Sequence, residues 1–201
     1  MAGALANKTA VVLLMMGGPQ SAAEVEPFLR ELFSDPYILS APLGPLRGLL
    51  AKRIAKKRAP LASAHYDRIG GGSPILANTR AQAEALQAEL LRRAGTPEAA
   101  PLVRVAMRYS APRAREVVAE LAALGIERVV GWPLYAQACS ATSRTSLEEL
   151  RQEVRRVGLA FADPDWRKGY PTLPGLIAAY TEPLKEALAA HPQAVVLFSA
   201  H

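Results

Sequence analysis

The chain has 201 residues, of which half are hydrophobic and 21 % are charged. That balance is typical of a soluble globular protein and argues against a disordered or collagen-like chain. Lysine and arginine outnumber aspartate and glutamate by 24 to 18, and the net charge of +6 favours anionic partners without selecting among phosphates, carboxylates, nucleic acid and acidic lipids. The single cysteine, Cys139, excludes an intrachain disulfide and a multi-cysteine metal site within this chain.

Neither a membrane span nor a secretion signal is recognisable in the sequence. No apolar run approaches the roughly 20 residues that a membrane-spanning helix needs. Residues 1–9 contain one lysine, no long apolar stretch and no clear cleavage site. We therefore expect a cytoplasmic protein in a reducing compartment.

The first elements are a strand and a helix. Residues 9–16 form a continuous apolar run that stops at a Gly-Gly-Pro sequence, which predicts a buried strand of a parallel sheet. Ser21 stands three residues before Glu24, the spacing of a capping box, and apolar residues follow at helical spacing. Pro27 fits poorly inside that helix and favours a start nearer to Pro27 than to Ser21.

Residues 36–62 interrupt this regular pattern. Prolines and glycines break up the segment, which predicts a loop that contains a short basic helix. A glycine-rich sequence, Ile69–Pro74, then predicts a rigid turn. Lys52, Arg53, Lys56, Lys57 and Arg58 form a basic cluster within this segment.

From residue 79 onward, helix and strand signals alternate. Thr79 with Gln82 marks one helix start, and Pro112 suits the first turn of the next helix. Thr145 and Glu148 form another capping box. The expected helices are 79–94, 112–124, 145–157 and 176–188, and the expected strands are 103–107, 128–135, 159–162 and 194–198.

This alternation predicts an α/β fold, a parallel sheet flanked by helices on both faces. The sequence stops at Ser199-Ala200-His201, directly after an expected buried strand. Ligands of open α/β folds bind just beyond the carboxyl ends of strands, and a last strand needs a helix to cover it. We therefore interpret the chain as the first part of a longer protein.

Polar residues stand at three of the expected strand or helix ends. The Gly70–Pro74 amides could hold an anion or form only a tight turn. Arg108 follows a strand, where it faces a ligand crevice or stays a solvated arginine. The hydroxyl residues from Tyr135 to Ser146 could line a pocket or cap a helix.

Among these residues His201 is the sharpest candidate for chemistry, because imidazole accepts a proton or binds a metal near neutral pH, although a single terminal histidine is weak evidence by itself. Cys139 has no neighbouring base, so we interpret it as a small buried or half-buried residue. The basic cluster of residues 52–58 is interpreted as a solvated face, and it lacks the interleaved aromatics of a nucleic-acid reader.

Six segments together resemble the ferrochelatases, the enzymes that insert ferrous iron into a porphyrin at the end of haem synthesis. The segments occur in the family's order, with family-like spacing, along the whole chain. The most specific are YDRIGGGSPI at residues 66–75 and FSAH at residues 198–201. The others are Leu14–Pro19, Ile54–Arg58, Met107–Tyr109, and Leu134–Tyr135 with the Ser/Thr-rich turn after it.

The resemblance implies a Rossmann-like chelatase lobe over residues 1–172, followed by the start of a second similar lobe, a connecting helix and a first strand, over residues 173–201. The porphyrin would lie in the cleft between the lobes. His201 would be the catalytic proton acceptor or a metal ligand, ferrous iron would be a substrate, and no organic cofactor would be needed. The porphyrin-binding residues it implies are Met16, Arg58, Tyr66, Ser73, Arg108, Tyr109, Tyr135 and Tyr170. Of these, Arg58, Tyr66 and Ser73 would hold the propionates, and Arg108 and Tyr109 would lie in the inner cleft.

The sequence also departs from the family pattern. Ala136 and Ala138 replace a proline and an aromatic residue that are usual there, and Arg144 enters a turn that is often glycine. The family's second catalytic element, an acidic residue across the cleft from the histidine, has no counterpart in residues 1–201. We therefore expect little or no metal insertion by residues 1–201 alone.

Several alternatives stay open at this point. The porphyrin is protoporphyrin IX or coproporphyrin III, and a chelatase for another metal or tetrapyrrole fits the same residues. A different class of function is a non-catalytic tetrapyrrole-binding module. We expect no nucleic-acid partner, and residues 43–58 offer a short basic amphipathic stretch for peripheral membrane contact.

Overall fold

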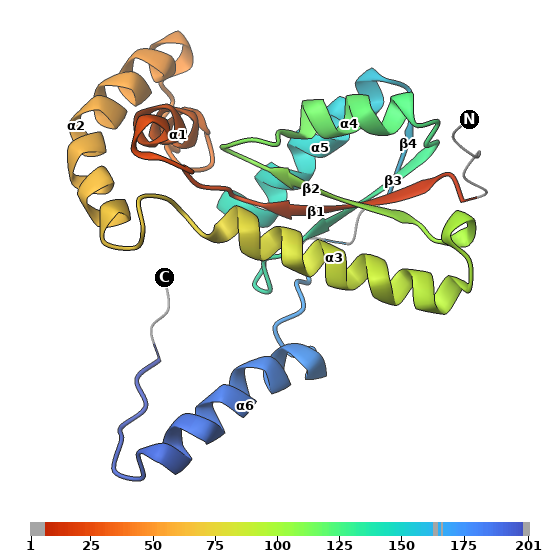
Figure 1. The fold of residues 1–201 in the computed structure, drawn as a ribbon. Helices are drawn as coiled ribbons and strands as arrows, with labels where there is room; N and C mark the ends of the chain where they lie inside the picture. The colour runs from red at the N-terminus through yellow and green to blue at the C-terminus, as the bar shows by residue number, and fades with distance from the viewer. Residues whose placement is uncertain (1–6, 163–164, 166, 199–201) are drawn as a thin grey trace.

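A computed structural model describes residues 7–162, 165 and 167–198 (Figure 1). Its centre is a parallel sheet of four strands: β1 (Thr9–Met15), β2 (Leu102–Met107), β3 (Arg128–Pro133) and β4 (Ala160–Ala162). The strand order is β2-β1-β3-β4, so β1 lies between β2 and β3 and pairs with both. The predicted α/β fold with a parallel sheet is confirmed.

Helices cover both faces of this sheet. The α-helices of the described residues are α1 (Ala22–Ser34), α2 (Arg47–Asp67), α3 (Ile75–Ala94), α4 (Ala114–Ala123), α5 (Thr145–Arg156) and α6 (Pro174–Ala190). Figure 1 shows α3 on one face of the sheet and α4 with α5 on the other. Short 3-10 turns occupy Gly44–Leu46 and Pro97–Ala99, and a π-helical turn occupies Ser140–Arg144.

The side chains of β1 alternate between the two faces, as the geometry of a strand requires. Val11, Leu13 and Met15 belong to the cluster beneath α3, whereas Val12 and Leu14 belong to the cluster beneath α4 and α5. A central parallel strand is buried on both sides, which explains its unbroken apolar sequence.

A third apolar cluster joins α1 to α2 at the carboxyl end of the sheet. We call it the α1–α2 cluster. Figure 1 shows the two helices side by side, past the end of β1. Its buried members are Val25, Phe28, Leu29, Phe33, Ala51, Ala55 and Tyr109, and the half-buried residues against it include Met16 and Tyr66.

The expectation of a loop with a short basic helix at residues 36–62 is wrong for most of its length. Helix α2 begins at Arg47 and runs through Pro60 to Asp67. Ala51 and Ala55 are fully buried against α1, so packing between the helices stabilises a segment whose composition indicates breaks. Small residues at i and i+4 let the two helices approach closely.

Three helix starts also differ from the expected positions. Helix α1 begins at Ala22, well before Pro27, and the Glu24 carboxylate accepts a hydrogen bond from the Gln20 amide at 2.9 Å. Helix α3 begins at Ile75, four residues before Thr79, whose hydroxyl donates to the Ile75 carbonyl. Pro112 precedes α4 instead of lying in its first turn.

Residues 194–198 are not a strand in this structure, which corrects the expectation of a final strand. Val195, Leu197 and Phe198 are all more than four-fifths exposed. A β-branched run needs a neighbouring strand to pair with, and the described part of the chain places none beside it. Helix α6 buries none of its residues.

The described part of the chain contains no helix that is long and apolar enough to cross a membrane.

Candidate functional site

The carboxyl ends of β1, β2 and β3 bring several of the expected site residues together. The Arg108 amide donates to the Met15 carbonyl at 2.8 Å, and the Tyr109 amide donates to the Met16 carbonyl at 2.9 Å. Met16, Arg108 and Tyr109 therefore lie at one edge of the sheet, as expected for residues that follow neighbouring parallel strands.

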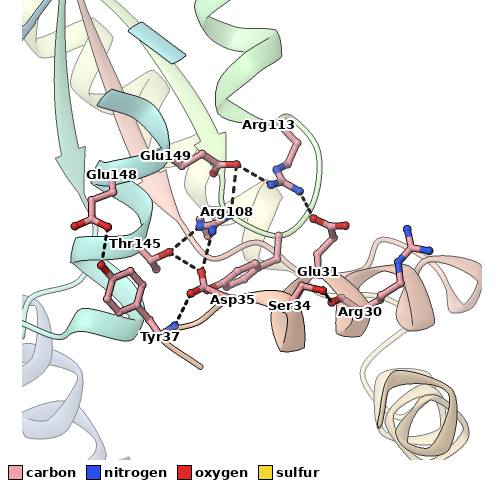
Figure 2. Close-up of polar contacts among 11 residues, drawn as sticks. Arg30, Glu31, Ser34, Asp35, Tyr37, Arg108, Arg113, Thr145, Glu148 and Glu149 are labelled. Atoms are coloured by element: carbon pink, nitrogen blue, oxygen red, sulfur yellow. Dashed lines mark hydrogen bonds and ion pairs between the residues drawn. The ribbon is translucent and has the colours of Figure 1, made fainter. Parts of the chain in front are cut away.

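Asp35, which the sequence did not single out, lies at the centre of this edge. Its side chain has no exposed surface. One oxygen, Oδ2, accepts hydrogen bonds from Arg108 Nη2 at 2.8 Å, from the Tyr109 hydroxyl at 2.9 Å and from the Thr145 hydroxyl at 2.6 Å (Figure 2). The other, Oδ1, accepts from the Tyr37 amide at 2.8 Å. A buried carboxylate needs such donors to offset its lost hydration.

A chain of alternating charges continues outward from Arg108. Glu149 lies 3.4 Å from Arg108 and 2.7 Å from Arg113, and Arg113 also contacts Glu31 at 3.1 Å. Burial alone would lower the pKa of Arg113, but its hydrogen bonds to Glu149 and Glu31 raise it. The network joins α1, β2, α4 and α5 (Figure 2), and within it Arg108 faces two carboxylates.

Thr145 and Glu148 do not form the expected capping box. Thr145 is the first residue of α5, and its hydroxyl donates to Asp35 and accepts from Arg108 Nε at 2.9 Å. Glu148 accepts hydrogen bonds from Arg144 and from the Tyr37 hydroxyl, both at 2.7 Å. The hydrogen bond to Glu148 raises the pKa of Tyr37. Both residues therefore tie α5 to the segment after α1.

Tyr109 forms part of an apolar wall. It is 3 % exposed and packs edge-to-face on Phe28, with ring centroids 6.4 Å apart. Burial raises the pKa of Tyr109, and the neighbouring charge of Asp35 raises it further. Met16 and Tyr66 pack against the same α1–α2 cluster, and burial raises the pKa of Tyr66 too.

Arg58 differs from Arg108 in its surroundings. It is an exposed residue of α2, and its guanidinium lies 5.4 Å from the centre of the Phe33 ring. Phe33 is a buried member of the α1–α2 cluster. Arg58 therefore places an exposed positive charge beside the apolar wall.

The glycine-rich turn packs closely against the backbone of residues 19, 20 and 66. Gly70 and Gly71 have φ of 100° and 87°, and the Gly71 amide donates to the Tyr66 carbonyl. The Ser73 amide donates to the Pro19 carbonyl at 2.7 Å, and a Cβ at residue 72 would come within 2.6 Å of the Gln20 carbonyl oxygen. These contacts favour the tight-turn interpretation over an anion cradle.

Tyr135 and Tyr170 lie near the end of β3. Burial raises the pKa of Tyr135, and its hydroxyl makes no well-formed hydrogen bond to the described residues. Tyr170 donates from its hydroxyl to the Pro133 carbonyl at 2.9 Å and stacks on Trp132. The Tyr170 amide also donates to the Ala136 carbonyl, so this tyrosine fastens the chain after β4 to the end of β3.

Comparison with known proteins gives these residues a context. The family model of the ferrochelatases matches residues 8–201. The chain belongs to the ferrochelatase family. It is 41 % identical to the mitochondrial ferrochelatase of Schizosaccharomyces pombe, over 96 % of this chain and 46 % of that protein. It is 39 % identical to the ferrochelatase of Geotalea daltonii, over 98 % of this chain and 60 % of that protein.

The chain thus spans about half the length of the curated ferrochelatases that it matches. His201, expected to be the catalytic histidine of a ferrochelatase, lies outside the described residues. Cys139 is exposed, which corrects its interpretation as a buried or half-buried residue. Across residues 7–162, 165 and 167–198, no group of three His, Cys, Asp or Glu side chains is placed to hold a metal ion.

Proposed function

We propose that the chain takes part in the insertion of ferrous iron into a porphyrin, and that it supplies the lobe that recognises the ring. The observation that carries the proposal is the wall at the carboxyl edge of the sheet. Met16, Tyr66 and Tyr109 share one apolar cluster there, and Arg58 holds an exposed cation beside it. A flat apolar ring with carboxylate side chains matches such a surface.

The proposed chemistry needs a base, an apolar pocket and a cation. A porphyrin must lose two N–H protons before a metal ion can bind between its nitrogens. We assign the acceptor role to His201, because imidazole takes protons near neutral pH. The apolar wall would hold the ring, and Arg58 would pair with its carboxylates.

The eight proposed porphyrin-binding residues divide into two groups. Met16, Arg58, Tyr66 and Ser73 keep exposed surface, so they are our candidates for direct contact with the ring. Tyr109 is buried, and Arg108, Tyr109 and Tyr170 use their polar groups inside the protein. Arg108 and Tyr109 would therefore shape the wall, and Tyr135 and Tyr170 would border it at the end of β3.

We also propose that residues 1–172 form one lobe and that residues 173–201 lead into a second. Helix α6 buries no residue, and residues 194–198 expose their apolar side chains. Both features are expected of a segment whose packing partner is another body of protein. The substrate would then lie between the two lobes.

A porphyrin titration followed by a metal-insertion assay tests this function. Protoporphyrin IX fluorescence is measured against the 201-residue chain and its His201→Ala variant, first without metal and then with ferrous iron under anaerobic conditions. We expect saturable binding by both proteins and little or no metal insertion by either. Absence of binding would contradict the proposed function, and insertion that depends on His201 would show that these residues suffice for catalysis.

Two alternatives are outcomes of the same experiment. Stronger binding of coproporphyrin III would identify the other porphyrin as substrate, and insertion of zinc or cobalt in preference to iron would indicate another metal. Porphyrin binding that persists without metal insertion when the rest of a family member is supplied in trans would favour a non-catalytic tetrapyrrole-binding module. The titration therefore includes both porphyrins and all three metals.

Peripheral membrane contact is proposed at α2. Leu49 and Leu61 are about two-thirds exposed on this helix, which also carries Lys52, Lys56 and Lys57. Exposed leucines beside lysines favour the surface of an anionic bilayer. Sedimentation with vesicles containing phosphatidylglycerol should retain the protein, and Leu49→Ser with Leu61→Ser should release it.

A further inference from the structure

We propose that Asp35 is a positioning residue that determines the charge presented to the porphyrin, an inference that rests on the proposed function. Asp35 and Glu149 together cancel the charge of Arg108, so recognition of the porphyrin carboxylates falls to Arg58. The family resemblance implies a propionate contact for Arg58 and a place in the inner cleft for Arg108. The structure distinguishes them by their partners.

The Arg108 charge lies beside the α1–α2 cluster. The guanidinium lies 5.0 Å from the centre of the Tyr109 ring, and Tyr109 is a member of the α1–α2 cluster. The Tyr109 amide donates a hydrogen bond to the carbonyl of Met16, another residue of the proposed wall. Arg108 directly precedes Tyr109 in the chain, so its charge lies next to this wall. At such separations an uncompensated charge would attract an anionic ligand.

Two carboxylates cancel this charge. Asp35 Oδ2 lies 2.8 Å from Arg108 Nη2, and the Asp35 side chain has no exposed surface. Glu149, which also pairs with Arg113 at 2.7 Å, adds a second carboxylate at 3.4 Å. Solvent screens this pair poorly because Arg108 is also mostly buried, so the two acids neutralise the guanidinium in place.

Hydrogen bonds also hold the Arg108 guanidinium in place. Its Nε donates to the Thr145 hydroxyl while Nη2 donates to Asp35, so two directions of the planar guanidinium are fixed. If Arg108 turned toward a ligand, Asp35 would keep its neutral donors, Tyr37, Tyr109 and Thr145, but a buried carboxylate would lose the cation that pairs with it. Among the described residues, no carboxylate pairs with Arg58, whose guanidinium lies over the Phe33 ring on an exposed part of α2.

The test compares protoporphyrin IX with its dimethyl ester, in which methylation removes the charge of both propionate groups. Dissociation constants are measured by fluorescence in dilute non-ionic detergent for the 201-residue chain and for Asp35→Asn. The ratio of the ester constant to the acid constant reports the charge that the site presents. We expect Asp35→Asn to raise this ratio on the order of three- to tenfold, because it leaves Arg108 under-compensated.

Additional variants show whether the effect acts through Arg108 and guard against misfolding. Asp35→Asn combined with Arg108→Gln should return the ratio to the wild-type value, because both charges of the pair are then gone. Glu149→Gln removes the less buried acid and should raise the ratio by a smaller factor. Glu127→Gln removes an acid that pairs with Lys8 on the surface, and it should leave the ratio unchanged.

The outcomes separate this inference from the proposed function. If the unaltered chain binds neither porphyrin, the proposed function is wrong and the inference falls with it. If it binds both, but Asp35→Asn and Glu149→Gln weaken the two ligands by equal factors, Asp35 only supports the fold and the inference alone is overturned. Near-ultraviolet circular dichroism identifies the variants that fold, and Glu149→Gln decides the question if Asp35→Asn does not.

Discussion

Gly17 shows how closely the chain packs where β1 ends. Its φ is +82°, and a Cβ at this position would lie 2.2 Å from Ser110 Oγ and 3.0 Å from Met107 Cβ. The same Ser110 oxygen accepts a hydrogen bond from the Gly18 amide at 3.1 Å. Only glycine fits both this backbone conformation and the close approach to Ser110 in the turn after β2.

We predict that Gly17→Ala lowers the free energy of unfolding by about 2 to 4 kcal/mol, because left-handed strain adds to a steric overlap. Gly95→Ala is the matched control, since Gly95 has φ of +79° but open space where the Cβ would lie. Gly95→Ala should lower the free energy of unfolding by about 1 kcal/mol. Urea denaturation measures both changes, and equal losses would contradict the role assigned to the Ser110 contact.

Glu89 gives a prediction about pH. Hydrogen bonds from Arg92 and Arg93 lower the pKa of Glu89 to about 2, below the ordinary value of 4.5. Between these values the unfolded chain binds more protons, so stability from this group is complete above pH 4.5 and is lost as the pH falls toward 2.

We expect Glu89→Gln to lower the urea midpoint at pH 6 and to have less effect at pH 2.5, where the carboxylate of the unaltered protein is itself being protonated. Both Arg92 and Arg93 are exposed, so the change at pH 6 should be small and should shrink further in high salt. Glu26→Gln, on the exposed side of α1, serves as the control. An effect of Glu89→Gln that is the same at both pH values would be inconsistent with this assignment.

At the scale of elements, the outer edge of β2 is closed by a side chain. Gln87 of α3 donates from Nε2 to the Pro101 carbonyl at 3.0 Å and accepts from the Val103 amide at 2.8 Å. Its amide therefore takes the place of a peptide group from a neighbouring strand. At the other end of β2, the Met107 amide donates to the Pro112 carbonyl. Unpaired strand edges promote aggregation, so these bonds protect the sheet.

Gln87→Leu should remove both hydrogen bonds and leave the Val103 amide without its partner. We predict a loss of about 1 to 3 kcal/mol in the free energy of unfolding, together with faster aggregation in light scattering at moderate temperature. Gln82→Leu makes the same change at an exposed position of α3. It should change neither the free energy of unfolding nor the rate of aggregation. Similar behaviour of the two variants would argue against edge protection.

The elements also show which parts of the fold sequence reasoning could reach. Strand β1 was predictable because a strand buried on both faces is apolar throughout, and Gly95 marked the end of α3 by its left-handed conformation. Helix α2 was not, because Ala51 and Ala55 gain their meaning only when α1 lies against them. Asp35 carried no local signal, since its four donors come from three separate segments.

At the scale of the whole molecule, the part of the chain after residue 173 carries exposed apolar surface. Leu197 and Phe198 are about nine-tenths exposed, and Val195 is nearly so. We predict that the isolated 201-residue chain self-associates as its concentration rises, because neighbouring apolar side chains are driven from water. Replacing Leu197 and Phe198 with serine should keep the protein monomeric in sedimentation velocity.

Leu124→Ser is the control for that experiment, since Leu124 is a singly exposed leucine at the end of α4. It should leave self-association as it is. A doubly substituted chain that still associates would show that another surface is responsible. The experiment also bears on the proposed second lobe, since a protein that supplied that lobe should suppress association in the same way.

The place of β1 between β2 and β3 has a consequence for synthesis of the protein. Translation at about 5 to 20 residues per second separates β1 from its first partner, roughly 90 residues later, by about 5 to 20 seconds. Helices α1 and α2 are complete by residue 67 and pack mainly on each other, and such local structure forms within microseconds to milliseconds. A nascent chain therefore carries a helical hairpin after an apolar strand that has no neighbour, and that strand stays open to aggregation until β2 has been made.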